Sequence, residues 1–421
     1  MRDTVVLIFL IVCIGAAIKK PWWGVLSLAV FSYLNPHAYA WGFVRTLPVY
    51  YVLFLVVAFR TFTTKDKQSI PKDWRVIFFV LLWFYFAFTS TQAYSPLVWS
   101  EFWNVTKIYL PFIFTLVLIN TKEKLYYLIV TIGISIGIVA VKGGIFAILT
   151  GFGHRVYGPP QTQFYDNNQF AVAMLIVIPL LLLWRKKSSH FLIKKGVFFS
   201  IPIIYLAALS SWSRGALLTM TVLTLMLIWK SKYKSLSIPV VVFGVFLTLP
   251  FLPEEWFARM HTIGTYEEDA SAMGRIEVWI DGWNHTLRHP FTGGGFGTWM
   301  YITKRDFHSS YIRMFSEHGF IAFGIWLSMI LGTVWNLTFL PKKTKKFEGM
   351  EWVTDYCFAL KASLICYMVG TAFLGLCYWD LLYHLIFLSV LVKKFALEEM
   401  AAKTPSDYRR RSLSPHAYSS S

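Results

Sequence analysis

Long apolar segments separated by short basic ones constrain the fold of this chain more than any other feature. About a dozen apolar blocks of about 14 to 25 residues follow one another along the sequence. Only 15% of the 421 residues are charged and 56% are hydrophobic, whereas about a quarter of the residues of a soluble domain are charged. Such a chain must hide most of its surface from water, so we predict an all-α polytopic membrane protein.

The positions of the blocks predict the number of spans. They cover residues 22–35, 48–63, 75–92, 103–119, 125–149, 169–184, 196–210, 214–229, 237–252, 318–339, 356–376 and 379–396. Residues 4–18 are a further candidate, which we interpret as retained because Lys19, Lys20 and Pro21 follow it in place of a small-residue cleavage site. We therefore expect about 12 transmembrane helices, or 13 with this segment.

Basic residues lie between the blocks and predict the orientation. The clusters are Lys65, Lys67 and Lys72; Arg185, Lys186 and Lys187; Lys230, Lys232 and Lys234; Lys342 to Lys346; and Arg409 to Arg411. If the spans alternate back from the basic C-terminal tail, every cluster falls on the cytoplasmic side. The opposite side then receives residues 36–47, 93–102, 150–168, 211–213 and 253–317.

These patterns divide the chain into four predicted regions. N-terminal transmembrane helices with short loops occupy 1–252, a periplasmic catalytic loop containing short helices occupies 253–317, C-terminal transmembrane helices occupy 318–397, and a cytoplasmic basic tail occupies 398–421. The net charge of +18 would suggest nucleic acid for a soluble protein. Because the basic clusters lie between spans, we expect inner-membrane lipid headgroups as partners and no nucleic acid.

Three arginines lie in segments predicted to face away from the cytoplasm, where the positive-inside rule disfavours cations. Arg155 stands in a Gly/Pro-rich turn and is explained equally well as an interfacial cation. Arg214 begins an apolar block after a short turn, and Gly215 beside it permits an anion to meet both the guanidinium and the helix N-terminus. Arg275 shares a predicted helical face with Trp279, although a plain interface helix would show the same pattern. Together they suit a diphosphate.

The rest of the long outer loop gives weaker signals. Arg288 follows the predicted helix and precedes TGGGFG, which lacks the terminal Gly-Lys-Ser/Thr of a phosphate-binding P-loop. The acidic residues Glu267, Glu268 and Asp269 are contiguous, and no His or Asp spacing typical of metal ligands surrounds them. We predict a site without metal or cofactor, because an electrophile that carries a good leaving group needs neither.

One histidine is a candidate general base. His308 lies two residues before Ser310, which we expect to cap the next helix. The helix dipole disfavours a protonated imidazole at that end, so His308 should be neutral near pH 7 and able to accept a proton. His318 is the alternative, but it is expected to lie deeper in the helix.

Taken together, these motifs resemble the O-antigen ligase and polymerase superfamily, in particular the ligase of lipopolysaccharide assembly. The resemblance covers most of the chain and rests on Arg155, Gly158 and Asn168; Ser213, Arg214 and Gly215; Gly274, Arg275 and Trp279; Pro290, Gly293, Gly295 and Gly297; and His308, Tyr311, Glu317 and Gly319. The opening stretch, with Asn35-Pro36-His37 and Trp41-Gly42-Phe43, also looks like a subgroup described as O-glycosylation ligases.

The resemblance implies a reaction and a location. Such ligases move a glycan from undecaprenyl diphosphate to a sugar hydroxyl of lipid A-core at the periplasmic face of the bacterial inner membrane. Arg155, Arg214 and Arg275 would hold the diphosphate, and His308 would take the acceptor proton or orient that hydroxyl. The family often has Asn after this histidine, where the present chain has Ser309.

Secondary candidates and other functions stay open at this point. Arg288 and Tyr311 are two of these candidates, and Tyr311 belongs to the histidine motif. Lys107 and Lys142 are the other two and fall toward the outer ends of their spans, where they extend the basic path for the donor or reach the headgroups. A polymerase or a protein O-oligosaccharyltransferase would use the same donor. A lipid-linked glycan transporter would instead place ionisable residues near mid-bilayer on broken helices.

Overall fold

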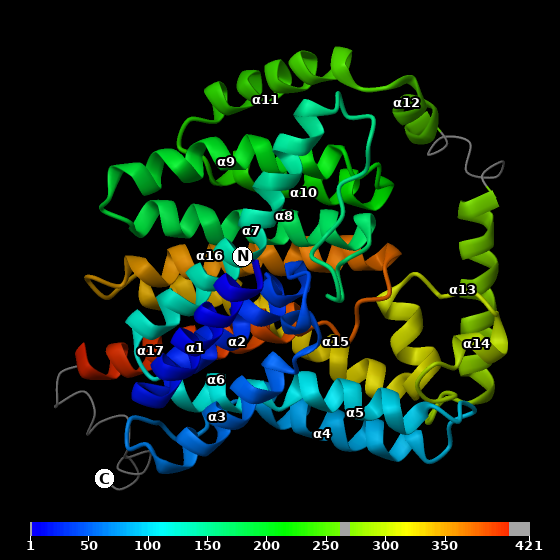
Figure 1. Ribbon diagram of the computed structural model, residues 1–421, viewed down its shortest axis with the longest axis horizontal. Helices are drawn as coiled ribbons and strands as arrows, with labels where there is room; N and C mark the ends of the chain where they lie inside the picture. The colour runs from blue at the N-terminus through cyan, green and yellow to red at the C-terminus, as the bar shows by residue number, and fades with distance from the viewer. Residues whose placement is uncertain (1, 262–269, 404–421) are drawn as a thin grey trace, which may run out of the picture.

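The structure is a computed structural model that describes residues 2–261 and 270–403, and every regular element in these ranges is helical (Figure 1). The helices are α1 (Arg2–Lys19), α2 (Pro21–Tyr33), η1 (Pro36–Tyr39), η2 (Phe43–Thr46), α3 (Val49–Thr63), α4 (Trp74–Ser90), α5 (Val98–Tyr109), α6 (Pro111–Leu118), α7 (Lys122–Leu149), α8 (Asn167–Lys187), α9 (Phe191–Leu209), α10 (Arg214–Lys230), α11 (Lys234–Thr248), η3 (Leu249–Phe251), α12 (Glu254–His261), α13 (Ala270–Arg288), α14 (Trp299–Ile302), α15 (Ser310–Thr344), α16 (Glu351–Gly370), η4 (Thr371–Phe373) and α17 (Asp380–Lys403). The predicted all-α class is confirmed for this part of the chain.

Each predicted apolar block coincides with helical structure, and one block is divided between two α-helices. Residues 103–119 form α5 and α6, which meet at Leu110 and Pro111. Proline has no N–H to donate to the carbonyl four residues earlier, so the helical hydrogen-bond ladder is interrupted there. Apolar sequence therefore predicted the helices, and proline set this internal boundary.

Within residues 2–261 and 270–403, six helical segments are long and apolar enough to cross a membrane, judged by length and composition. They are Lys122–Leu149, Asn167–Lys187, Phe191–Leu209, Lys234–Phe251, Ser310–Thr344 and Glu351–Phe373. The apolar helices Val49–Thr63 and Trp74–Ser90 are shorter. These helices give the chain the character of a multi-pass membrane protein, while the total of 12 or 13 spans stays a prediction.

Helix α8 forms the centre of the bundle. Every side chain from Phe170 to Leu181 is buried, and α8 packs against α7, α9 and α16. A helix that is apolar on all sides is typical of such a fully enclosed position. Outer helices instead expose large apolar side chains, among them Phe62, Trp229 and Trp335, as expected of helices that face lipid.

The two ends of the bundle differ in character. The connections α8–α9 and α15–α16 and the C-terminal end of α17, which carry basic residues, lie at the left of Figure 1. Helices α12, α13 and α14 gather at the right. Helices α12 to α14 of the predicted outer loop therefore lie at the opposite end of the molecule from these basic connections.

Helix α15 begins earlier than the apolar pattern indicated. It starts at Ser310, inside the segment 253–317, and bends at Gly319, whose φ of 75° and ψ of 178° are not helical. A Cβ at Gly319 would meet the backbone of Pro290 and Phe291, so only glycine fits. The polar turns from 310 to 317 hid this first part of the helix from a search for apolar runs.

Candidate functional site

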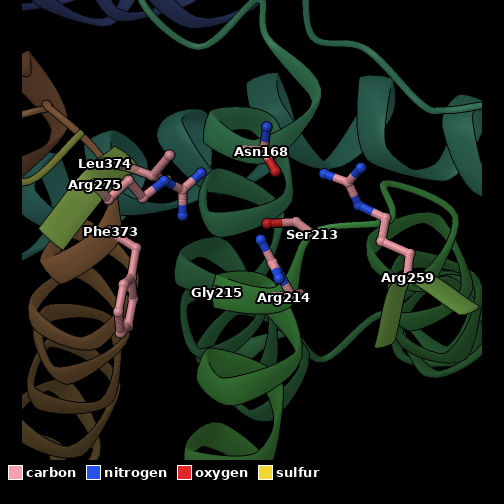
Figure 2. Close-up of a pocket in the computed structure, with 8 residues that line it drawn as sticks. All are labelled: Asn168, Ser213, Arg214, Gly215, Arg259, Arg275, Phe373 and Leu374. Carbon is pink, nitrogen blue, oxygen red and sulfur yellow. The ribbon is translucent and has the colours of Figure 1, made fainter. Parts of the chain in front are cut away.

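A small pocket, with about 300 Å³ of empty space that is partly open to solvent, lies where α8, α10, α12 and α13 meet the connection after α16. Its walls are Asn168, Ser213, Arg214, Gly215, Arg259, Arg275, Phe373 and Leu374. Figure 2 shows Arg259 and Arg275 reaching in from opposite sides, with Ser213 and Arg214 between them. Three guanidinium groups from three helices thus line one pocket.

The start of α10 places Arg214. Ser213 is the N-cap, and its side chain accepts a hydrogen bond from the Ala216 amide at 3.3 Å. Asn167 donates its side-chain amide to the Ser211 carbonyl at 2.6 Å, which holds the turn before α10 against the start of α8. The predicted combination of a guanidinium and a helix N-terminus at one place is present, and it favours an anion there.

Gly215 is not required by crowding. The nearest atom to a Cβ built on it is the Cβ of Phe373 at 3.6 Å, which is ordinary van der Waals contact. The glycine leaves the pocket floor open rather than relieving a clash.

Arg259 was not among the sequence candidates. Its Nε donates to the Trp212 carbonyl at 2.8 Å, and the Trp256 indole on the same helix donates to the Leu209 carbonyl at 3.1 Å. These two bonds fix α12 on the turn between α9 and α10 and aim Arg259 into the pocket. The signal in the sequence is a cation three residues after a tryptophan in a short amphipathic helix, a spacing that puts both on one face.

Helix α13 brings Arg275 to the other wall. The Trp279 indole, one turn further on, donates to the Phe307 carbonyl at 2.7 Å, and its ring lies 6.2 Å from that of Phe373. Gly274 has no side chain, and Arg305 occupies the space where one would be, with Nη1 2.9 Å from the ideal Cβ position. The segment before α15 is therefore packed against the helix that carries Arg275.

Arg155 lies beside the pocket rather than in its wall. Its guanidinium sits 5.6 Å from the ring centroid of Trp212, the residue whose carbonyl holds Arg259. Its side chain is exposed, and the loop that carries it is bonded to the same turn through Val156 and Ser210. The structure thus brings Arg214 and Arg275 together as expected. It places Arg155 outside the pocket wall, next to Trp212.

His308 lies immediately before the start of α15. The N-cap is Ser309, one residue earlier than predicted, and it makes no side-chain capping bond. His308 has a φ of 45°, a conformation uncommon outside glycine, and its side chain is half exposed. The next residue but one, Ser310, donates to the Leu374 carbonyl at 2.7 Å and accepts from the Leu376 amide at 2.8 Å. Ser310, two residues after His308, therefore bonds the start of α15 to the pocket wall at Leu374.

His318 is unsuited to act on a substrate. It is fully buried, its Nδ1 lies 2.6 Å from the Thr89 hydroxyl, and its Nε2 lies 2.7 Å from the Tyr378 hydroxyl. The Tyr378 hydroxyl also donates to Glu317 at 2.5 Å. Both imidazole nitrogens are used inside the fold, which agrees with the expectation that His318 lies deeper.

The glycine cluster from Gly293 to Gly297 packs against α15 just before its bend at Gly319. Gly293, Gly295 and Gly297 all have positive φ values. The amides of Gly294 and Gly295 donate to the carbonyls of Ser316 and Glu317, and the Gly297 amide donates to the Glu317 carboxylate at 3.0 Å. These amides are engaged by the protein itself, so this loop is not a phosphate cradle.

The secondary candidates lie outside the pocket wall. Arg288 donates to the Asn284 carbonyl at 3.3 Å and is exposed. Burial, with help from the cations of His289 and Arg288, lowers the pKa of nearby His285 to about 4. The Tyr311 hydroxyl donates to the Met368 carbonyl at 3.0 Å, so its polar atom is used in packing.

The two lysine candidates lie on other helices. Lys107 is exposed, sits 5.5 Å from the ring of Tyr51 and donates to Asn104 at 3.3 Å. Lys142 is exposed 5.4 Å from the ring of Tyr39. Both make cation–π contacts near the N-terminal helices, and neither lines the pocket.

Metal ligation has no obvious location in the described ranges. No three side chains among His, Cys, Asp and Glu gather there in a group that could hold an ion. The acidic residues Glu267, Glu268 and Asp269 lie outside the described residues. The metal-free site stays a prediction for experiment.

Two models of known protein families match parts of this chain. Residues 198–327 match the family model described as O-Antigen ligase. This segment contains Arg214, Arg259, Arg275 and His308, and the match supports a place in the O-antigen ligase and polymerase superfamily. Residues 1–189 match a second model, described as a family of unknown function (DUF5935). No curated protein matches the chain.

The superfamily match has a coarse functional meaning. It indicates a membrane glycosyltransferase-like enzyme of the ligase or polymerase type, with a lipid-linked glycan donor and a lipid-type acceptor in general terms. All three arginines of the pocket wall lie in the matched segment, whereas Arg155, Lys107 and Lys142 lie in the segment of unknown function.

Proposed function

We propose that this protein is an O-antigen ligase that transfers a glycan from undecaprenyl diphosphate to a sugar hydroxyl of lipid A-core. The observation that carries the proposal is the pocket wall shared by Arg214, Arg259 and Arg275, inside the segment that matches the O-Antigen ligase model. A diphosphate is the leaving group that such a pocket would recognise, because planar guanidinium groups bind phosphate oxygens in bidentate fashion.

The positive charge of the pocket would stabilise the leaving group as its bond to the glycan breaks. As the acceptor oxygen attacks the anomeric carbon, the bond from that carbon to the diphosphate oxygen breaks and its electron pair moves onto the diphosphate. Preorganised cations stabilise this developing charge more than the ground state, which is the usual largest contribution to catalysis. The N-terminus of α10 beside Arg214 adds to the same effect. This chemistry needs no metal and no further cofactor.

His308 would handle the proton. A neutral imidazole accepts the hydroxyl proton of the acceptor as the new carbon–oxygen bond forms, and the imidazolium then returns that proton to solvent. Its half-exposed side chain precedes a helix that is hydrogen-bonded to the pocket wall at Leu374. This placement, outside the buried core, is what access to a large glycan acceptor requires.

The two ends of the bundle support the proposed orientation. Basic connections lie at one end and the arginine pocket lies among α12, α13 and the turn before α10 at the other (Figure 1). The positive-inside rule then assigns the pocket to the periplasmic face of the inner membrane, with the segment 398–421 in the cytoplasm.

The start of α1 supports a thirteenth span. The Asp3 carboxylate accepts hydrogen bonds from the amides of Trp41 and Gly42, and at the other end of the helix Arg60 donates to the Ile18 carbonyl. Helix α1 therefore runs the length of the α2–α3 pair, with its N-terminus on the side of the predicted outer segment 36–47.

Two rivals share the donor. An O-antigen polymerase would pass the glycan to another lipid-linked glycan, and a protein O-oligosaccharyltransferase would pass it to Ser or Thr. A lipid-linked glycan transporter is a different class, and the arginine pocket at one end of the bundle favours an enzyme over it.

The glycolipids of a strain that lacks this protein distinguish these functions. A ligase predicts loss of polymer on lipid A-core and accumulation of polymer on the carrier lipid. Single-repeat core caps would instead indicate a polymerase, and unchanged lipopolysaccharide with lost glycoprotein would indicate the protein-directed enzyme.

Complementation with variants then tests the base. His308→Ala should restore less than about 1% of ligation, because a positioned general base contributes about 10² to 10⁴ in rate. His289→Ala is the matched control, since His289 is another exposed histidine at the same end of the molecule. Full complementation by His308→Ala would show that His308 is not the base.

A further inference from the structure

We propose that Asp306 is the positioning residue for His308, an inference that rests on the proposed function. A histidine that accepts a proton needs a partner that fixes which nitrogen carries hydrogen and that favours the imidazolium once it forms. The residue after His308 is Ser309, which is buried and makes no side-chain capping bond. The carboxylate that faces the imidazole belongs to Asp306, two residues before His308.

Two contacts join Asp306 to His308. One carboxylate oxygen, Oδ1, accepts the backbone N–H of His308 at 3.4 Å, and the other, Oδ2, lies 3.8 Å from the imidazole Nδ1. The backbone contact is the i to i+2 turn that aspartate side chains form readily. It coincides with the positive φ of 45° at His308. The same carboxylate therefore bends the chain and faces the ring.

Asp306 lies near a buried cation. Gly375 neighbours both groups, because a Cβ on it would sit 3.4 Å from Asp306 Oδ1 and 3.5 Å from Arg313 Nη1, and its carbonyl accepts from Arg313 at 3.4 Å. The Arg313 Nε also donates to the buried Glu317 carboxylate at 3.3 Å. A cation that is paired with Glu317 therefore lies in the neighbourhood of Asp306, and Gly375 places no side chain beside the two groups.

This arrangement assigns the two ring nitrogens. The carboxylate 3.8 Å from Nδ1 favours the tautomer with hydrogen on Nδ1, which leaves the lone pair of Nε2 for the acceptor hydroxyl. When the proton moves to Nε2, the ring becomes cationic beside a carboxylate at ion-pair distance. The transition state gains this attraction and the ground state does not, so the contribution belongs to kcat.

The magnitude follows from the exposure of the pair. Loss of the aspartate in a buried Ser-His-Asp triad costs about 10⁴ in kcat. Here the side chains are 50% and 33% exposed, so water screens the pair and the effect is smaller. We expect Asp306→Asn to lower the single-turnover transfer rate by about 10- to 100-fold and to leave donor binding within about 2-fold.

A double-mutant cycle on full-length protein in proteoliposomes tests the inference. The substrates are undecaprenyl-diphosphate-linked glycan and lipid A-core, and transfer and donor binding are measured separately for wild type, Asp306→Asn, His308→Ala and the double variant. Asp281→Asn is the matched control, because it removes an exposed carboxylate from α13 in the same region. Asp306→Asn should cost nothing further once His308 is alanine.

The outcomes separate the two proposals. No transfer by wild type would refute the proposed function, and wild-type transfer by His308→Ala would refute the base. Slow transfer by His308→Ala with normal transfer by Asp306→Asn would refute the positioning role alone. An equal cost of Asp306→Asn in both backgrounds would also refute it, because the carboxylate would then act independently of the imidazole.

Discussion

Arg259 gives the sharpest prediction, because the structure places it in the pocket wall and places Arg155 outside. We expect Arg259→Ala to impair ligation strongly and Arg155→Ala to impair it weakly. Arg259 points into the pocket from α12, opposite Arg275 (Figure 2). Arg155 contacts only the ring face of Trp212 among the contacts described for it.

The expected sizes follow from the two environments. Arg259 lines the pocket, and we expect its guanidinium to donate one hydrogen bond to a bound diphosphate. One hydrogen bond to a charged group contributes about 1.5 to 3 kcal/mol, which is about 10- to 100-fold at 1.4 kcal/mol for each factor of ten. An exposed cation–π contact is worth about 0.5 to 1 kcal/mol. We therefore expect Arg155→Ala to lower the transfer rate by only about 2- to 5-fold.

The assay compares transfer rates and donor affinities of the two variants in proteoliposomes at matched protein amounts. Thermal melting in detergent controls for folding, because Arg259→Ala also removes the bond that tethers α12 to Trp212. Arg259→Gln is a second variant that is neutral yet able to donate to that carbonyl. If Arg155→Ala lost more activity than Arg259→Ala with both proteins folded, the assignment of the pocket wall as the diphosphate site would be refuted.

Four further predictions concern charge, metal, orientation and pH. Arg214→Lys should lose most activity in the transfer assay although it keeps its charge, because an ammonium cannot form the bidentate fork; wild-type activity would mean that the cation only anchors α10. Purified enzyme should stay active in excess EDTA, and loss of activity that Mg²⁺ restores would contradict the arginine mechanism. A cysteine at Gln163 should react with an impermeant thiol reagent added from the periplasm and one at Ser188 should not, and the reverse pattern would overturn the orientation. Burial lowers the pKa of His285 to about 4 from 6.5. Protonation therefore favours the unfolded chain, and the stability of the protein should fall as the pH is lowered from 6.5 toward 4. The melting temperature of His285→Phe should fall less over that range.

The sequence alone determined the helices of this protein. Apolar blocks longer than about 14 residues have few alternatives to helix in a bilayer, because every backbone N–H and C=O must be bonded within the segment. Each block therefore coincides with helical structure, and α8 is central because it is apolar on every side. The same reasoning could not find the start of α15 at Ser310, where polar residues form a helix that packs against the glycine loop.

Residues of the site could be predicted from the sequence only where a local sequence pattern marked them. Arg214 follows a capping serine at the start of an apolar block, and Arg275 shares a face with Trp279, so both could be named from spacing. Arg259 could not be preferred over Arg155, because both lie in segments predicted to be outer and their order along the chain does not say which one the turn at Trp212 directs into the pocket.

Tertiary structure alone decided which charged groups meet. The Trp212 carbonyl accepts a hydrogen bond from Arg259, the Phe307 carbonyl accepts one from the Trp279 indole, and the Gly375 carbonyl accepts one from Arg313. These contacts join residues far apart in sequence through single backbone atoms, and backbone carbonyls carry no residue identity that a sequence pattern could reveal. A continuous apolar block specifies a helix along its whole length, whereas the pocket depends on a few directional hydrogen bonds that exist only after the helices have packed.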